Sequence, residues 1–171
     1  WLMDTFRLVR PSSIVMALLY GAGAALGWEA LHVWLMPATG LDAQSFSRYV
    51  APVTEEIAKA VFVAVLIARG RVGFLVDAAV LGFAVGTGFA IVENMTYLRD
   101  FGEAPLVMWA LRGLGTGVLH GATTAVAAIV GKAMADRYPR FRLGALPGVA
   151  IGIVWHSIYN HLLVWPALAA M

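Results

Sequence analysis

The sequence predicts an all-α, polytopic transmembrane bundle of about five spanning helices, with its N-terminus in the cytoplasm. Of the 171 residues, 61% are hydrophobic and only 13% are charged. The mean hydropathy is +0.80, well above the range of soluble domains. A spanning helix needs about 20 residues, so this length accommodates five such helices joined by short loops. We therefore expect a single transmembrane domain over residues 1–171.

Five apolar segments predict the spans, and they cover, in chain order, residues 14–34, 51–68, 74–97, 108–134 and 146–168. The first follows a Pro11-Ser12-Ser13 helix-start signal and is rich in glycine and alanine, which favour close helix contact in lipid. The second ends at Arg69-Gly70-Arg71. Pro147 falls in the first turn of the fifth, where proline is tolerated. Polar connectors are predicted at residues 37–49, 98–105 and 136–142.

The basic residues support this topology independently of hydropathy. A cytoplasmic N-terminus places these on the inside: Arg7, Arg10, Arg69, Arg71, Lys132, Arg137, Arg140 and Arg142. Only Arg48 and Arg99 then lie outside, as the positive-inside rule requires, and the C-terminus is also outside. No basic run is interleaved with exposed aromatic residues, so nucleic acid is not expected as a partner. The chain starts at Trp1 rather than methionine, and we expect a trimmed N-terminus.

Three charges lie within the second predicted span, namely Glu55, Glu56 and Lys59. Each costs about 2.5–3.5 kcal/mol at the centre of a spanning helix, whereas a large apolar residue returns only about 0.3–0.6 kcal/mol. The apolar residues available here do not offset three charges. The other helices must therefore surround this one and supply partners for its charges.

The candidate partners are predicted to lie at a similar depth below the outer membrane surface. Counted at about 1.5 Å per residue from the expected outer helix ends, they lie roughly 6–14 Å below the outer surface. This set consists of Glu55, Glu56, Glu93, His120, His156 and Asn160. Glycines recur beside them at helical spacing, at Gly82 and Gly86, at Gly113, Gly117 and Gly121, and at Gly148 and Gly152. Because glycine rows allow helices to approach closely, these faces are expected to pack together and form one polar pocket.

Carboxylates and imidazoles in a desolvated pocket can activate a water molecule for hydrolysis, either as general bases or by holding a metal ion. Lys59 is placed to pair with Glu55 or Glu56, since it lies one helical turn after both. Asn160 and Arg112 are candidates for stabilising an oxyanion. The absence of cysteine excludes disulfides, thiolate metal ligands and a cysteine nucleophile.

Four ordered motifs carry a resemblance to a known family. They are EEIAK at residues 55–59, GFAIVEN at residues 88–94, HGATT at residues 120–124 with Arg112 before it, and HSIYN at residues 156–160. These motifs resemble the series found in the PrsW family of bacterial intramembrane proteases, which is similar in turn to the CAAX prenyl endopeptidases and their bacterial relatives. The resemblance spans residues 53–161, within a motif core of about residues 51–165. Residues 1–50 form the first helix and loop.

The resemblance implies an endopeptidase of the bacterial cytoplasmic membrane that cleaves membrane-anchored, single-span substrates such as anti-sigma factors. The catalytic residues it implies are Glu55, Glu56, Glu93, His120, His156 and Asn160, supported by Lys59, Asn94, Arg112 and Thr124. Two routes of water activation stay open. Either a glutamate acts alone, or one zinc ion is held by Glu56, His120 and His156. No HExxH helix is present.

Two alternative functions stay open. Buried Glu, His, Arg and Lys also occur in proton-coupled transporters and channels, but those commonly carry internal repeats, which this chain lacks. A catalytically inactive scaffold of the same fold is the second reading. Asp77, beside Arg71, is expected to be a solvated flank outside the site. The sequence leaves the oligomeric state open.

Overall fold

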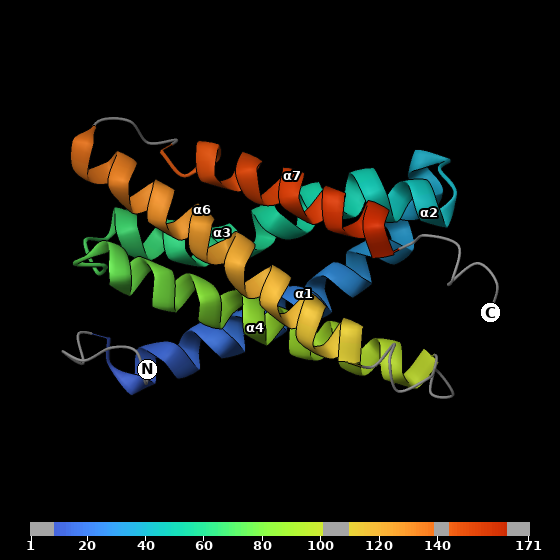
Figure 1. Ribbon diagram of the computed structural model, residues 1–171, viewed down its shortest axis with the longest axis horizontal. Helices are drawn as coiled ribbons and strands as arrows, with labels where there is room; N and C mark the ends of the chain where they lie inside the picture. Colours follow the sequence, from blue (N-terminus) through green and yellow to red (C-terminus); the bar gives the residue numbers. More distant parts are fainter. Residues whose placement is uncertain (1–8, 101–109, 139–143, 164–171) are drawn as a thin grey trace.

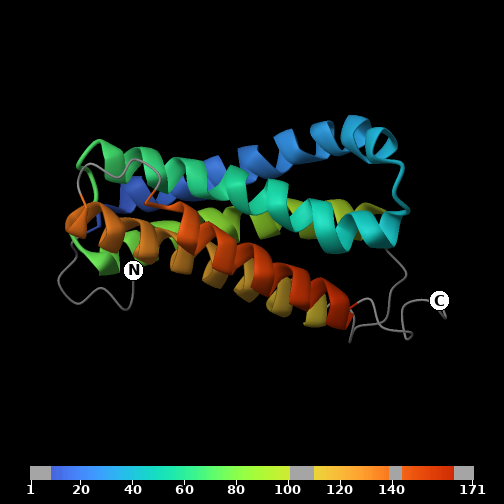
Figure 2. The same ribbon diagram turned by 90° about the horizontal axis from the view of Figure 1, so that it is seen from above.

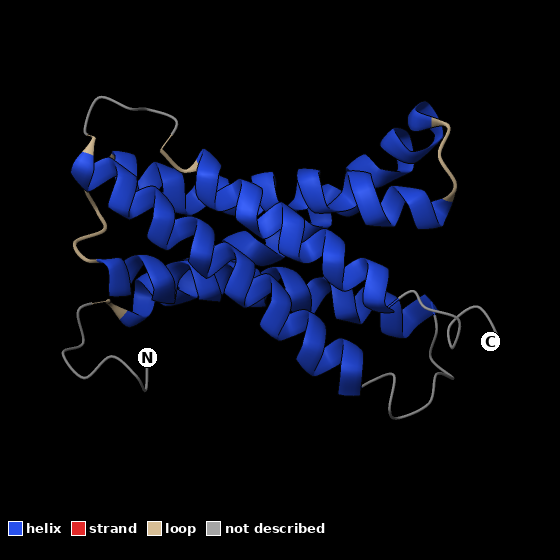
Figure 3. Cartoon of the chain, turned by 45° about the horizontal axis from the view of Figure 1, so that its top comes forward, coloured by secondary structure: helices blue, strands red, loops and turns tan. Residues whose placement is uncertain are grey.

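The computed structural model describes residues 9–100, 110–138 and 144–163, and within them the chain is helical, with no strand (Figure 3). The five long helices are α1 (Pro11–Thr39), α3 (Ala51–Ala68), α4 (Leu75–Asp100), α6 (Gly117–Arg137) and α7 (Leu146–Leu163). Shorter elements precede two of them: α2 (Ala43–Ser45) and the π-helix η1 (Phe46–Val50) before α3, and the π-helix η2 (Leu111–Thr116) before α6.

The long helices run antiparallel along the chain and form a bundle with two ends. We call the end at which α1, α4 and α7 begin the Arg71 end, and the end at which α3 and α6 begin the Arg48 end. α4 packs against α1 on one side and α6 on the other, and α6 also packs against α7. Figure 1 shows α6 crossing α4 obliquely, and Figure 2 shows α3 beside α7.

Three of these helices are long and apolar enough to cross a membrane: Pro11–Thr39, Leu75–Tyr97 and Gly113–Arg137. The predicted all-helical fold is therefore confirmed, and three of the five predicted spans correspond to helices of this kind in the described part of the chain. The two other long helices carry most of the polar residues of the predicted site, while Glu93 lies on α4 and His120 on α6. α3 contains Glu55, Glu56 and Lys59, and α7 contains His156 and Asn160, so their composition reflects contacts inside the bundle rather than contact with lipid.

The connector predicted over residues 37–49 is wrong in part, because helical structure occupies most of it. α1 continues to Thr39 and ends at Gly40, whose φ of 67° lies in the left-handed region that glycine adopts without strain. Asp42 then caps α2 by accepting a hydrogen bond from the Ser45 backbone N–H at 3.0 Å. The predicted end of the fifth span at residue 168 and the start of the fourth at residue 108 lie outside the described residues.

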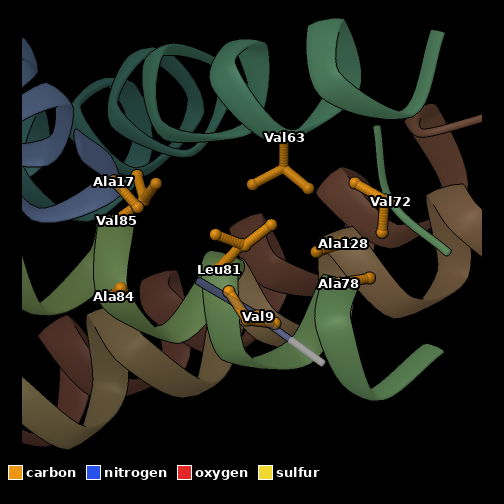
Figure 4. Close-up of a cluster of buried hydrophobic side chains, with 9 residues drawn as sticks. All are labelled: Val9, Ala17, Val63, Val72, Ala78, Leu81, Ala84, Val85 and Ala128. Carbon is orange, nitrogen blue, oxygen red and sulfur yellow. The ribbon is translucent and has the colours of Figure 1, made fainter. Parts of the chain in front are cut away.

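An apolar core near the Arg71 end holds α1, α3, α4 and α6 together (Figure 4). Its members are Val9, Ala17, Val63, Val72, Ala78, Leu81, Ala84, Val85 and Ala128. A second cluster nearer the Arg48 end contains Ala25, Trp28, Phe46, Ala51 and Phe89. The polar residues of α3 lie along the helix between Ala51 of the second cluster and Val63 of the first.

Glycines set the closest helix contacts. A Cβ added to Gly86 would lie 2.0 Å from the His120 carbonyl oxygen, and one added to Gly82 would lie 2.7 Å from the Thr124 carbonyl oxygen. α4 and α6 therefore touch through their backbones, as predicted. The expectation fails at Gly113 and Gly117, where an added Cβ meets no described atom within 4 Å. Of that row, only Gly121 is packed, against the ring of Phe83.

Asp77 is not the solvated flank that the sequence suggested, because its residue surface is only 7% exposed. It lies in the first turn of α4, and its Oδ2 accepts a hydrogen bond from the Phe74 backbone N–H at 2.9 Å. This contact satisfies one of the N–H groups that a helix start leaves without an intrahelical partner. Capping thus draws Asp77 back against the bundle.

Candidate active site

The titratable residues predicted on separate helices meet in one buried cluster. α3 contributes Glu55, Glu56 and Lys59, while Glu93, His120 and His156 come from α4, α6 and α7. Lys59 and His120 have no exposed surface, and Glu56 retains only 2%. Charges buried to this degree require partners, because an unpaired one costs several kcal/mol. The contacts within the cluster supply them.

Lys59 lies at the centre of the cluster. Its Nζ is 2.6 Å from Glu56 Oε1 and 2.6 Å from His120 Nδ1. The ammonium also lies 4.8 Å from the centre of the Phe89 ring, which adds a cation–π contact. An ammonium only donates hydrogen bonds, so Nδ1 of His120 must be the acceptor. His120 is therefore neutral on this side and carries its proton on Nε2.

His120 also forms a hydrogen bond to α4. Its Nε2 lies 2.7 Å from Glu93 Oε2, and since a carboxylate accepts, the ring N–H donates to it. The Glu93 side chain is 29% exposed, in contrast to the fully buried ring. The row Lys59, His120, Glu93 thus connects the interior of the cluster to its accessible edge.

His156 connects the two glutamates of α3. Its Nδ1 lies 2.9 Å from Glu56 Oε1, so Nδ1 carries the proton and donates to the carboxylate. The other ring nitrogen, Nε2, lies 3.9 Å from Glu55 Oε2. That separation is too long for a direct hydrogen bond. The ring also makes an edge-to-face contact with His120, at 4.9 Å between centroids.

Sequence comparison places this cluster in a family. The sequence model that describes PrsW family intramembrane metalloproteases matches residues 10–171. The chain belongs to the PrsW family. Searches with this chain find no match among the curated proteins or among the solved structures. The family resemblance predicted from the four motifs is therefore confirmed, and every residue of the buried cluster lies within the matched range.

The PrsW family description implies a metal ion, and three buried side chains of this chain are close enough together to hold one, with His120 exchanging its hydrogen bond to Lys59 or to Glu93 for the metal. Glu55, His120 and His156 each offer one ligand atom, and these atoms lie within 4.8 Å of one another. One carboxylate and two imidazoles are typical ligands of catalytic zinc, which keeps a further position open for water. Glu56, hydrogen-bonded to Nδ1 of His156, would be the outer carboxylate that orients a histidine ligand.

This grouping differs from the sequence-based ligand set, which named Glu56 instead of Glu55. The reason is local: Glu56 Oε1 is already held by Lys59 and His156, while Glu56 Oε2 lies against Gly152, whose added Cβ would be 3.2 Å away. The adjacent Glu55 presents its Oε2 to Nε2 of His156. The two neighbouring glutamates thus have separate positions: Glu56 contacts Lys59 and His156 Nδ1, and Glu55 faces His156 Nε2.

Asn160 has a partner outside the cluster. Its Nδ2 donates to the Ser47 carbonyl oxygen at 2.8 Å, and Ser157 Oγ donates to the Arg48 carbonyl oxygen at 2.8 Å. Both acceptors belong to η1, the π-helix before α3. π-Helical turns occur mostly as single interruptions near functional sites. α7 therefore anchors the segment that leads into Glu55 and Glu56, an arrangement that no sequence pattern indicated.

Two of the remaining predicted residues, Asn94 and Thr124, lie within one helical turn of Glu93 and His120. Asn94 follows Glu93 on α4, and its Oδ1 is buried without a hydrogen-bond partner. Thr124 is 1% exposed, one turn after His120. Thr116, at the end of η2, lies 3.5 Å from the Tyr159 hydroxyl. The side chain of Arg112 lies outside the described residues.

Proposed function

We propose that this chain is an intramembrane endopeptidase that hydrolyses peptide bonds of membrane-anchored, single-span proteins, of which anti-sigma factors are the expected class. Membership of the PrsW family supports the protease activity. The observation that carries the assignment of residues is the pair formed by Glu55 Oε2 and His156 Nε2, 3.9 Å apart in a buried site. A water oxygen at about 2.8 Å from each atom fits this gap.

Glu55 is the proposed general base. It takes a proton from the water as the water oxygen attacks the carbonyl carbon of the scissile bond, and the new C–O bond forms as the carbonyl becomes an oxyanion. The C–N bond then breaks while Glu55 returns the proton to the leaving nitrogen. Exclusion of bulk water strengthens the electrostatic contribution of every nearby group.

The other residues hold this geometry. Glu56 fixes the ring of His156 by accepting from Nδ1, and Lys59 holds Glu56 in its charged form. His120 and Glu93 extend the network to its more exposed edge. In the alternative, metal-assisted route, Glu55 would be a ligand together with His120 and His156 instead of the base, and the cation would supply Lewis-acid polarisation of water and of the scissile carbonyl. Asn160 acts in this proposal as a positioning residue for η1.

The proposed topology has five spans in the bacterial cytoplasmic membrane, with the N-terminus in the cytoplasm and the C-terminus outside. The described basic residues support it, because Arg10, Arg69, Arg71, Lys132 and Arg137 lie toward the Arg71 end. α3 and α7 then cross the bilayer with their polar faces turned into the bundle. The whole of residues 1–171 forms one protease domain.

The test is cleavage of a purified single-span substrate by the purified protein in detergent or liposomes. Glu55→Gln, Glu56→Gln and His156→Ala should each reduce cleavage at least a hundredfold, while the control Glu29→Gln, whose carboxylate pairs with Thr96 away from the cluster, should keep it. Equal cleavage by all four variants would remove this site from the proposal.

A second measurement separates the two routes of water activation. Metal analysis of the purified protein is combined with titration of a chelator into the cleavage reaction. Stoichiometric metal, loss of activity with the chelator and recovery on adding zinc back would assign the metal-assisted route. Full activity in metal-free protein would assign the reaction to Glu55 alone.

A further inference from the structure

A cavity lies at the Arg71 end, away from the buried cluster. Its volume is about 460 Å³, and it is formed by α1, α3 and α4 with the α3–α4 connection. The polar lining consists of Arg10, Ser13, Arg71 and Asp77. The apolar lining includes Met16, Phe62, Leu66 and Leu81, and Figure 4 shows the position of Leu81 on α4 beside Val9. The cavity therefore combines charged groups with an apolar wall.

Its two guanidinium groups attract an anion. In the described part of the chain, neither the Arg10 nor the Arg71 side chain forms a hydrogen bond or an ion pair. The first turn of α1 also lines the cavity, and the N-terminus of a helix carries a partial positive charge. Arginine is well suited to bind a phosphate group, because its planar fork donates two parallel hydrogen bonds.

Asp77 adds an acceptor to the same cavity. Its Oδ2 caps α4, but its Oδ1 is buried and has no hydrogen-bond partner. The residue is 7% exposed, so this oxygen is shielded from bulk water. A buried carboxylate oxygen without a donor costs free energy, and a ligand ammonium would satisfy it. The lining of the cavity thus combines two guanidinium groups with a carboxylate whose Oδ1 lacks a donor.

We propose that this cavity binds the headgroup of phosphatidylethanolamine. The lipid phosphate lies between Arg10 and Arg71, the primary ammonium donates to Asp77 Oδ1, and an acyl chain covers Met16, Phe62 and Leu66. The apolar wall and the spanning helices on either side favour a lipid over a free phosphate. Basic pockets between membrane helices are established binding sites for lipid headgroups in general. This inference does not depend on the proposed protease activity.

The test is native mass spectrometry of the purified full chain with defined lipids. Phosphatidylethanolamine should remain bound at higher occupancy than phosphatidylcholine, because a quaternary ammonium has no N–H to donate to Asp77. Glycerophosphoethanolamine and inorganic phosphate form separate arms and should bind much more weakly, since neither has an acyl chain. Equal occupancy by the two lipids, or equal binding of inorganic phosphate, would overturn the proposal.

Three variants locate the site. Arg10→Gln and Arg71→Gln should each weaken phosphatidylethanolamine binding roughly fivefold. Asp77→Asn keeps an acceptor for the Phe74 N–H, so the helix start is retained, and it should shift the preference toward phosphatidylglycerol, which has no ammonium. Arg69→Gln is the matched control, because Arg69 lies at the same end but does not line the cavity, and it should bind as the unmodified protein does. An unchanged lipid preference in Asp77→Asn, or equal losses in all four variants, would contradict the assignment.

Discussion

Lys59 Nζ lies 2.6 Å from His120 Nδ1, and the two residues come from helices separated by 61 positions in the chain. Because an ammonium cannot accept, this contact fixes the histidine tautomer and directs the Nε2 proton toward Glu93. The same ammonium neutralises Glu56. A residue that sequence inspection assigns only as a charge partner of its own helix therefore also links α3 to α6.

Replacing Lys59 with methionine should destabilise the protein by about 3–5 kcal/mol, because it leaves the buried Glu56 carboxylate without its counter-charge. Unfolding in detergent, followed by the thermal midpoint and by loss of helical circular dichroism, measures the effect. Cleavage activity should fall in parallel, since His120 loses the donor that sets its tautomer.

The double variant Glu56→Gln/Lys59→Met is the control for that prediction. It removes both charges, so it should be more stable than Lys59→Met alone and give a favourable coupling energy for the pair. If the two single losses simply add, Lys59 and Glu56 do not interact energetically despite their 2.6 Å contact.

Glu55→Gln and Glu56→Gln should differ in what they damage. The first removes the proposed base and should lower kcat about 10²- to 10⁴-fold with little change in stability. The second keeps the shape of the side chain but leaves Lys59 unpaired, so it should lower both activity and the free energy of unfolding. Parallel measurement of cleavage and thermal unfolding separates the roles. Identical profiles for the two variants would contradict the separate positions described for these carboxylates.

Asn160→Ala should lower stability by about 1 kcal/mol through loss of one hydrogen bond to η1, with a less than tenfold effect on kcat. The oxyanion role suggested by the sequence requires a larger loss, about 10²- to 10³-fold. Ser157→Ala is a matched control, because it removes the equivalent bond to the next carbonyl of the same π-helix. A kcat loss of a hundredfold in Asn160→Ala but not in Ser157→Ala would favour the oxyanion role.

Gly86→Ala should destabilise the protein by about 1–3 kcal/mol or more, because the new methyl group collides with the His120 carbonyl oxygen. Since His120 must move to relieve the collision, activity should decrease too. Gly23→Ala on α1 is the control, because its added Cβ meets no described atom within 4 Å. That variant should stay within about 1 kcal/mol of the unmodified protein in the same unfolding measurement.

The convergence of the polar residues could be predicted because each obeys a rule that sequence alone exposes. Glu55 and Lys59 are too costly to face lipid, and His120 and His156 recur at the same helical depth. The approximate helix positions and the membrane character could be predicted from hydropathy, because apolar segments of about 20 residues are typical of spanning helices.

The misassigned features depend on contacts that no periodicity encodes. Asp77 appears solvated from its neighbour Arg71, but the N–H of Phe74 holds it against the bundle. The π-helix at Phe46–Val50 could not be predicted from local sequence, because side chains more than a hundred positions away donate to its Ser47 and Arg48 carbonyl oxygens. Which of the two glutamates faces Nε2 of His156 likewise depends on a contact that the sequence does not show, the one between Lys59 and Glu56.

The backbone contact between α4 and α6 also constrains how a polypeptide would reach the proposed catalytic residues. Where Gly86 meets the His120 carbonyl oxygen, there is no space for a side chain, and still less for an extended strand. A substrate cannot be threaded through this seam without pulling the two helices apart. A route to Glu55 would have to open between another pair of helices, while the backbones of α4 and α6 stay in contact.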